Sequence, residues 1–488
     1  MLKENDIISK VLLSIKQCKG NLATFKTSIT DNEYTPSGCS HFTRTLVWKV
    51  CLMTHTLKIQ GWESKLTDSR VVYHELVKRE DLAIPWWKLD VDSEFYLTKE
   101  TSKHKTRIGR QRTMRIKQNL IRVGNVDDPL RSPGISPSRK PQPYVTTEDD
   151  LELLQTIILD IDRLFPGDSF FLATNPNSFA SKKQMIEILF VWSKCNPQVG
   201  YKQGIHEILG LLYLNIHTES IEIPTTNTFS GDDLRILNLY DIKYIAHDLF
   251  TLFNQFMVQS GIIARFYEDE KILWKNIESF NAYLMKVDQL IHYNLISKLK
   301  LESQIWIIRY LRLMLSRELG NDLSAVSLLW DKLVATQLSG KASALLAIPD
   351  IIIFMTIQLL IQQKTELITC DFSESLSLLL HYPLPAKISN PTFRSEYISD
   401  LYKDALKLYE RKDNDLKLYE YGIKLNNKYN PKLKITMTYT GSVRNSKDST
   451  SSMDHSPSPT PDKSEKLKFE KLRLEMRLKK KAQQLMNK

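Results

Sequence analysis

Two short polar patterns in this 488-residue sequence carry side chains suited to catalysis. The first lies in IILDIDRLFP, where Asp160 precedes Arg163 by three positions. The second lies in VGYKQGIHEILG, which presents Tyr201, Gln203 and Gly204 before an apolar segment. An arginine can stabilise the charge on a transferring phosphoryl group, and a glutamine can orient a water molecule. Neither pattern contains a complete active site.

The first pattern is expected at the end of a helix. Thr146 and Thr147 precede three consecutive acids, which is typical of a helix N-terminus. An apolar stripe then runs to Phe165, and Pro166 ends the helix because the residue before a proline is pushed out of helical geometry. Asp160 and Arg163, at positions i and i+3, lie off this stripe. Asp160 is therefore expected to orient the Arg163 guanidinium.

The second pattern is expected at the start of a helix. An apolar helix containing Met185 and Trp192 ends near Pro197, and a short loop leads to the next apolar segment from Ile205. Gln203 would then lie near a helix N-terminus, where free backbone N–H groups favour phosphate oxygens.

Familiar self-contained catalytic motifs are missing. The sequence contains neither a GxxxxGK[ST] phosphate loop nor a GxSxG elbow, and no GxGxxG follows an expected strand. His206-Glu207 begins like a zinc-binding helix, but Gly210 occupies the position of the second histidine. We therefore expect no metal site, and the Arg163–Gln203 pair remains the best candidate for chemistry.

Composition predicts an all-α protein. Apolar residues make up 42 % of the chain, glycines number only 16, and Leu/Ile-rich segments follow helical periodicity. The five cysteines form no CxxC or Cys/His cluster, which disfavours zinc and disulfides and indicates a reducing compartment. The apolar run 351–361 is short for a membrane span and is expected to be a buried helix. Further helices are expected over 303–319 and within 395–425.

We expect the chain to divide into five regions, of which the main domain takes its bounds from the family resemblance described below. Residues 1–37 form an amphipathic helix and a lead-in, and residues 38–425 form the main domain. That domain is interrupted at about 101–145 by a basic, Pro- and Ser-containing insertion. Residues 426–464 are a low-complexity linker expected to be disordered, and residues 465–488 a basic amphipathic or coiled-coil-like helix.

The formal net charge of +11 suits several anionic partners. The basic insertion has two interpretations, a solvated surface segment or a contact with an anionic membrane. Nucleic acid is not expected, because no aromatic residues are interleaved with the basic run.

The ordered set of motifs resembles the TBC-domain family, the GTPase-activating proteins of Rab/Ypt GTPases. The family's IxxDxxR and YxQG motifs read here Ile157–Asp160–Arg163 and Tyr201–Gln203–Gly204. Its upstream Arg–Trp motif reads Arg44 to Trp48, for which the residues alone favour a guanidinium stacked on a core tryptophan. Further matches are YIAHD (244–248), WIIRYLRLMLSRE (306–318) and LWD (329–331). The sequences of these motifs are most similar to those of fungal Ypt-directed activators that act in Golgi–endosome traffic.

The resemblance implies a two-lobed helical domain that activates a GTP-bound Rab/Ypt GTPase in trans and is not a self-contained enzyme. Arg163 and Gln203 would be catalytic fingers, Asp160, Tyr201 and Gly204 would support them, and Arg44 and Trp48 would stabilise the fold. The protein would need no cofactor of its own, because GTP and Mg²⁺ belong to the partner. It would be cytoplasmic and recruited to Golgi or endosomal membranes through peripheral contact with anionic lipids.

Two open points accompany this resemblance. A non-catalytic TBC scaffold or Rab-effector binding module is the alternative function. The sequence also departs from the family pattern at Leu164, where threonine is usual after the finger arginine, and at Thr45, where glycine is common. The sequence predicts neither the effect of Leu164 nor the identity of the substrate GTPase.

Overall fold

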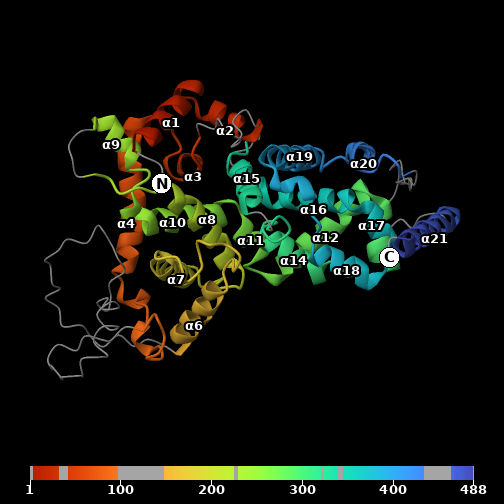
Figure 1. Cartoon of the computed structure of the whole chain (residues 1–488), viewed down its shortest axis with the longest axis horizontal. Helices are drawn as coiled ribbons and strands as arrows, with labels where there is room; N and C mark the ends of the chain where they lie inside the picture. The colour runs from red at the N-terminus through yellow and green to blue at the C-terminus, as the bar shows by residue number, and fades with distance from the viewer. Residues whose placement is uncertain are drawn as a thin grey trace, which may run out of the picture. The chain divides into compact units, whose positions relative to one another are not determined.

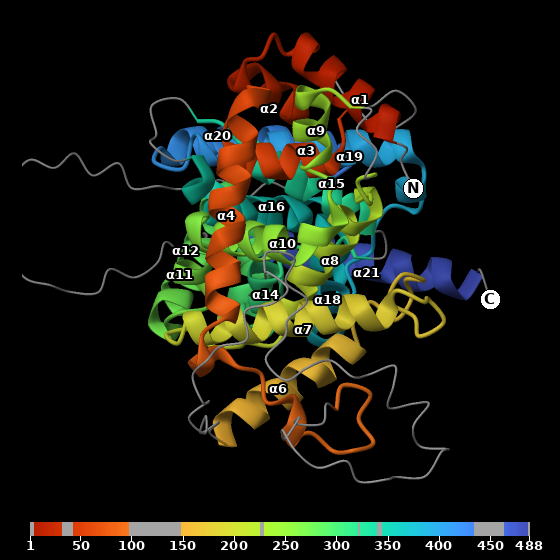
Figure 2. The ribbon, with the colours of Figure 1, turned by 90° about the vertical axis from the view of Figure 1, so that its left-hand side faces the viewer.

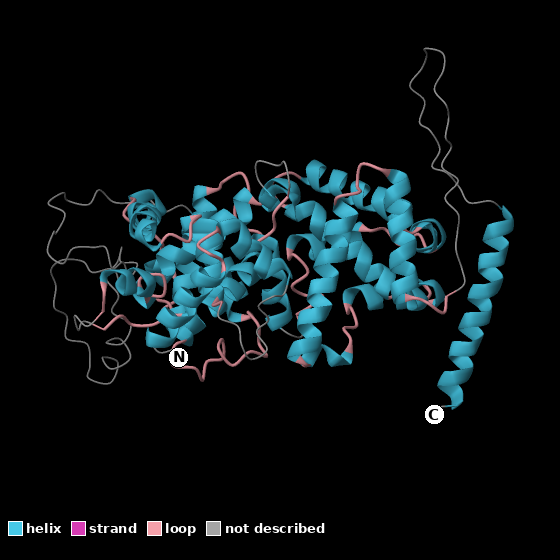
Figure 3. Ribbon diagram, turned by 90° about the horizontal axis from the view of Figure 1, so that it is seen from above, coloured by secondary structure: helices cyan, strands magenta, loops and turns pink. Residues whose placement is uncertain are grey.

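The computed structural model describes residues 4–31, 42–96, 148–224, 229–320, 323–338, 344–433 and 463–486. Within these ranges the chain is built from helices and loops, without a strand longer than the isolated bridge between Ile221 and Asp241 (Figure 3). The predicted all-α class is therefore confirmed. The basic insertion at 101–145 and most of the predicted linker lie outside the described residues.

The helices group into two compact units, and unit 1 comprises residues 1–268 and 326–346 (Figure 1). Its helices are α1 (Glu4–Gln17), α2 (Leu22–Asp31), α3 (Arg44–Lys49), α4 (Trp62–Val77), α6 (Glu148–Asp162), α7 (Ser178–Cys195), α8 (Ile205–Glu219), α9 (Gly231–Leu237), α10 (Ile245–Asn254), α11 (Ile262–Phe266) and, from Val326, α15 (Leu323–Val334). The amphipathic pattern at the start of the chain forms α1, which packs against α9.

A central helix organises unit 1. The apolar helix α10 packs against α4, α7 and α8. Its Asp248, in the YIAHD pattern, is completely buried and accepts hydrogen bonds from Lys49 (2.6 Å) and from Arg70 Nε (2.8 Å). Breaking such a pair would leave an uncompensated buried charge. The YIAHD match in the sequence therefore corresponds to a structural ion cluster.

The candidate catalytic patterns lie on three consecutive helices of unit 1. Helix α6 packs on α7, and both contact α8 (Figure 2). Leu154, Ile157 and Ile161 form the buried stripe of α6 that the periodicity predicts. The helix nevertheless ends at Asp162, earlier than the expected Phe165, whose backbone is left-handed with φ of 40°.

Unit 2 comprises residues 269–325 and 347–488. Its helices are α12 (Glu270–Val287), α13 (Gln289–His292), α14 (Gln304–Arg312), α16 (Ile348–Gln362), α17 (Lys364–Thr369), α18 (Phe372–Leu380), α19 (Pro391–Tyr409), α20 (Asp415–Tyr429) and α21 (Lys463–Met486). By length and composition the segment Ala344–Gln362 would suffice to cross a membrane, and 78 % of this stretch is buried inside the protein. The prediction of a buried helix at 351–361 is confirmed.

The expected helix over 303–319 is wrong in its second half. Helix α14 ends at Arg312, and Met314 and Leu315 adopt left-handed backbone angles of 48° and 63°. The chain then turns back so that Glu318 meets Arg309 at 2.9 Å, with the carboxylate fully buried. Packing of this turn against the core outweighs the local helical pattern.

Two other boundaries differ from the expectation. The helical region expected within 395–425 is two helices, α19 and α20, and α20 continues beyond Leu425 to Tyr429. The expected C-terminal helix is α21, which begins at Lys463 and not at the expected residue 465, and it lies against α17.

Candidate functional site

Arg163 occupies the turn that follows α6. Its backbone N–H donates to the Asp160 carbonyl at 3.2 Å, so the helix tightens and ends there. Its side chain is exposed, and among the described residues the guanidinium has no hydrogen-bond or ion-pair partner. Asp160 and Arg163 therefore do not form a surface ion pair. Arg163 keeps its full set of donors available to another molecule.

Leu164 explains how this turn is held. Its side chain is 3 % exposed and lies against Gly210, in the middle of α8. A Cβ atom on Gly210 would come within 2.6 Å of Leu164 Cδ2, so only a glycine leaves room for this contact. The leucine found at the usual threonine position therefore anchors the Arg163 turn on the helix that follows Gln203.

Gln203 lies in the turn before α8. Gly204 is the N-cap of that helix, and its φ of 99° is a conformation that favours glycine. This geometry accounts for glycine at this point of the YxQG pattern, and it confirms that Gln203 lies at a helix N-terminus. The Gln203 side chain is exposed and has no partner within the described part of the chain.

A buried hydrogen-bond cluster joins the two patterns. The Tyr201 hydroxyl donates to Asp160 Oδ2 at 2.8 Å and lies 3.0 Å from His206 Nδ1, which is itself 3.4 Å from Asp160 Oδ2. Burial, followed by the hydrogen bond to the Asp160 carboxylate, raises the pKa of Tyr201. The phenol therefore stays a neutral donor at physiological pH. The last turn of α6 is thereby tied to the turn that carries Gln203.

This cluster changes the expected role of Asp160. We expected its carboxylate to orient Arg163, but among the described residues it makes no bond to that guanidinium and instead accepts from Tyr201. Asp160 joins the turn that carries Arg163 to Tyr201, while Leu164 packs the same turn on α8. The supporting roles of Tyr201 and Gly204 remain predictions, with a geometry that agrees with them.

Arg44 and Trp48 meet a third residue rather than stacking on each other. Arg44 Nε donates to Asp331 Oδ2 at 2.8 Å, and Trp48 Nε1 donates to Asp331 Oδ1 at 2.8 Å. The Glu219 carboxylate also accepts the backbone N–H groups of Arg44 and Thr45 at 2.9 and 2.7 Å. These contacts bind α3 to α15 and α8, so the Arg–Trp and LWD patterns are parts of one structural joint.

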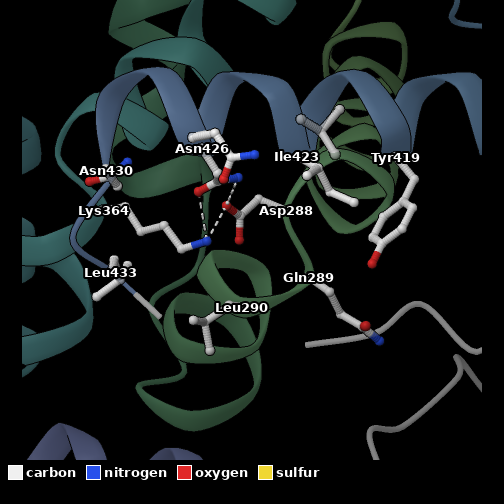
Figure 4. Close-up of a pocket in the computed structure, with 11 residues that line it drawn as sticks. Asp288, Gln289, Leu290, Lys364, Tyr419, Ile423, Asn426, Asn430 and Leu433 are labelled. Carbon is white, nitrogen blue, oxygen red and sulfur yellow. Dashed lines mark hydrogen bonds and ion pairs between the residues drawn. The ribbon is translucent and has the colours of Figure 1, made fainter. Parts of the chain in front are cut away.

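A cavity of about 50 Å³ in unit 2 is lined by a second cluster of polar side chains, Lys364, Asp288 and Asn426 (Figure 4). Lys364 Nζ donates to Asp288 Oδ2 at 2.6 Å and to Asn426 Oδ1 at 2.8 Å, and Asn426 Nδ2 donates to the same Asp288 oxygen at 2.9 Å. The second Asp288 oxygen accepts the Ile291 N–H and caps α13. Because these groups satisfy one another, the cavity is a structural joint between helices.

Sequence reasoning overlooked two residues of the site, His206 and Gly210. Both were considered only as an incomplete zinc motif, and their proximity to Tyr201 and Leu164 depends on how α6 packs against α8. Within the described ranges, no group of three His, Cys, Asp or Glu side chains is arranged to hold a metal ion.

Comparison with known proteins identifies the domain. Residues 136–368 match the family model of the Rab-GTPase-TBC domain. Arg163, Gln203 and their supporting residues lie inside this range, whereas Arg44 and Trp48 precede it.

Individual relatives agree with this match. TBC1 domain family member 5 of Mus musculus is 23 % identical over 274 residues, which cover 51 % of this chain and 32 % of the relative. Its homolog B of Dictyostelium discoideum is 32 % identical over 108 residues, or 22 % of this chain and 10 % of the relative. The alignments thus span about a third or less of these relatives.

A solved structure is similar in fold. The Ypt/Rab-GAP domain of Gyp1p superposes with a TM-score of 0.53 at 15 % identity, covering 82 % of this chain and 98 % of that one. The helical architecture, the motif set and the family match lead to one conclusion: the chain contains a Rab-GTPase-TBC domain, matched over residues 136–368.

Proposed function

We propose that the chain accelerates GTP hydrolysis by a GTP-bound Rab/Ypt GTPase, with Arg163 and Gln203 supplied in trans. The observation that carries the proposal is their shared state: both side chains are exposed and unpaired within the described residues, while the turns beneath them are tied together by Asp160 and Tyr201. Buried polar side chains are normally satisfied within the protein, whereas exposed and unpaired ones stay accessible to another molecule.

The chemistry follows from what a slow GTPase lacks. Hydrolysis spreads negative charge over the transferring phosphoryl group, and the attacking water must be held in line. Arg163 would place its charge at the γ-phosphate and the leaving oxygen, and Gln203 would orient the water in place of the GTPase's own glutamine. An arginine finger accelerates hydrolysis about 10³–10⁵-fold, which corresponds to about 4–7 kcal/mol of barrier. GTP and Mg²⁺ would come with the partner.

The cellular setting extends this proposal. We expect a cytoplasmic protein that is recruited to Golgi or endosomal membranes, where it would act on vesicle traffic. Basic segments near an anionic leaflet add about 1 kcal/mol of attraction per Lys or Arg, and both the insertion and α21 are rich in these residues.

A panel of purified Rab/Ypt GTPases loaded with GTP tests the activity. Single-turnover hydrolysis should accelerate for a subset of the panel when the full chain is added. GTP-dependent binding without acceleration of any GTPase would favour the non-catalytic scaffold and would overturn the proposal.

A further inference from the structure

Helix α21 docks on unit 2 through one defined face. Phe469 is 1 % exposed and packs with Leu290 and Ile368, and its ring meets Tyr293 edge-on with centroids 5.8 Å apart. Met476, two turns further along, is partly buried against the same cluster. The apolar side of α21 that contains Phe469 is thus already covered by the protein.

Polar contacts fix the rotation of α21 about its axis. Arg473 donates from Nε to the Ile368 carbonyl at 2.9 Å and from Nη2 to the Cys370 carbonyl at 3.0 Å. Both carbonyls lie at the C-terminal end of α17, where unpaired carbonyl groups favour a cation. Arg477 adds a 3.1 Å bond to Asp371, the N-cap of α18. These arginines are engaged by the protein.

A second apolar stripe remains on the opposite side of α21. Leu467, Leu474 and Leu478 are 72, 61 and 60 % exposed. Their spacings of seven and four residues place them on one face of a helix, and at 3.6 residues per turn that face is opposite Phe469.

Exposed lysines border one edge of this stripe. Lys468, Lys471 and Lys479 are exposed, and Glu475 is the exposed acid among residues 467–479. The whole of α21 contains nine Lys and Arg against three Glu. Pairing with a second copy would bring two strongly positive helices together, whereas an anionic surface complements this charge. Leucines bordered by lysines are typical of helices that lie in the interface of a bilayer.

We propose that docked α21 binds an anionic lipid surface through Leu467, Leu474 and Leu478, with the neighbouring lysines at the headgroups. The inference specifies the face behind the peripheral recruitment proposed above. It differs from insertion of a free tail helix, which would use the Phe469 side. Because Phe469 and Arg473 hold the helix on unit 2, the folded domain would be fixed to the membrane and not merely tethered.

Vesicle flotation with the full chain tests this face. Wild-type protein should float with phosphatidylserine-containing vesicles and not with phosphatidylcholine alone. The triple variants L467S/L474S/L478S and K468Q/K471Q/K479Q should each bind much more weakly. Losing three lysines should lower the partition coefficient about a hundredfold, at roughly fivefold per lysine. Circular dichroism should show that the helical content is retained.

Three results would overturn the inference. They are unchanged flotation of the leucine variant, equal binding to neutral vesicles, and a dimer that sediments in the wild type and dissociates in the leucine variant while flotation persists. Hydrolysis of GTP by a soluble GTPase should be unaffected by either triple variant. Failure of flotation is therefore distinguishable from failure of the proposed activity.

Discussion

The surface around Arg163 and the cavity around Lys364 present similar functional groups in opposite states. Each of the two regions contains a cationic side chain and an amide side chain near the end of a helix. At the cavity, Lys364, Asp288 and Asn426 satisfy one another within 2.9 Å, and the two charges are almost completely buried. Arg163 and Gln203 are exposed and have no partner in the described part of the chain.

This difference separates groups that hold the fold from groups that are available to another molecule. The hollow in unit 2 has the outward form of a binding site, but its charged side chains, Lys364 and Asp288, are engaged with each other and with Asn426. At Arg163 the nucleotide, metal and water would arrive with the partner. For an activator that works in trans, unpaired exposed groups on a rigid support are better evidence than a cavity.

The largest expected effect belongs to Arg163. Arg163→Ala should lower GTPase activation by about 10³–10⁵-fold, while the free energy of unfolding stays within about 0.5 kcal/mol, as for most surface substitutions. Arg163→Lys should recover little, because it keeps the charge and loses the planar fork of donors. Single-turnover rates and urea denaturation measure the two properties. A destabilised, active variant would remove the contrast with the cavity.

Lys364 should show the reverse behaviour. Lys364→Ala leaves Asp288 buried without its cation and should cost about 3–5 kcal/mol of stability. Activation measured below the unfolding transition should be unchanged. Lys202→Ala provides the matched control, since Lys202 is exposed in the turn beside Gln203 and should change stability by less than about 0.5 kcal/mol. Loss of activation in a folded Lys364 variant would contradict the structural role of the cavity.

Glu318 is a second buried ionisable group that serves the fold, and it should make the free energy of unfolding depend on pH. Burial raises the pKa of Glu318 to about 7, and the nearby Arg309 only partly counteracts it. Between pH 4.5 and 7 the folded protein keeps a proton that the unfolded chain has lost, so the free energy of unfolding should fall as the pH rises. The loss should be on the order of 3 kcal/mol. Glu318→Gln should flatten this dependence in denaturation at several pH values, and an equally steep profile would refute the assignment.

Substitution of Gly210 tests whether the contact between Leu164 and α8 holds the turn that carries Arg163. Gly210→Ala places a Cβ 2.6 Å from Leu164 Cδ2 and should cost about 1–3 kcal/mol, as overpacking does. Activation should fall as well, because the Arg163 turn is displaced. The double variant with Leu164→Ala should regain part of both losses. Gly61→Ala is the control, since its new Cβ would meet only an ordinary contact of 3.7 Å. Full activity in Gly210→Ala would exclude Leu164 as an anchor.

Tyr201 should give a modest effect on stability. Tyr201→Phe removes one hydrogen bond to Asp160 and should cost about 0.5–1.5 kcal/mol. If the cluster positions the two fingers, the maximal activated rate should fall while the concentration of activator needed for half-effect changes little. The opposite division, with weaker binding and an unchanged maximal rate, would assign Tyr201 to the interface with the GTPase.

Local pattern located α6 and α8 and the turns near Arg163 and Gln203, although α6 ends at Asp162 and not at the expected Phe165. Apolar periodicity predicted α6 and α8, and Gly204 indicated the turn that precedes α8. Local sequence pattern could not predict which side chains meet between helices. The Asp160 carboxylate accepts a hydrogen bond from Tyr201 and not from Arg163. Asp331, more than 280 positions along the chain from Arg44 and Trp48, binds both of these side chains. The reversal after Arg312 was missed for the same reason, since packing of Met314 and Leu315 into the core outweighs helical propensity.

The central claim is that Arg163 and Gln203 act together on a nucleotide held by another protein. Its most direct test is single-turnover GTP hydrolysis by a responsive Rab/Ypt GTPase with wild type, Arg163→Ala, Gln203→Ala and the double variant. Each single variant should lose most of the activation while remaining folded, and the double variant should lose little more, because residues that act as a unit are non-additive. Wild-type rates in both single variants would contradict the account.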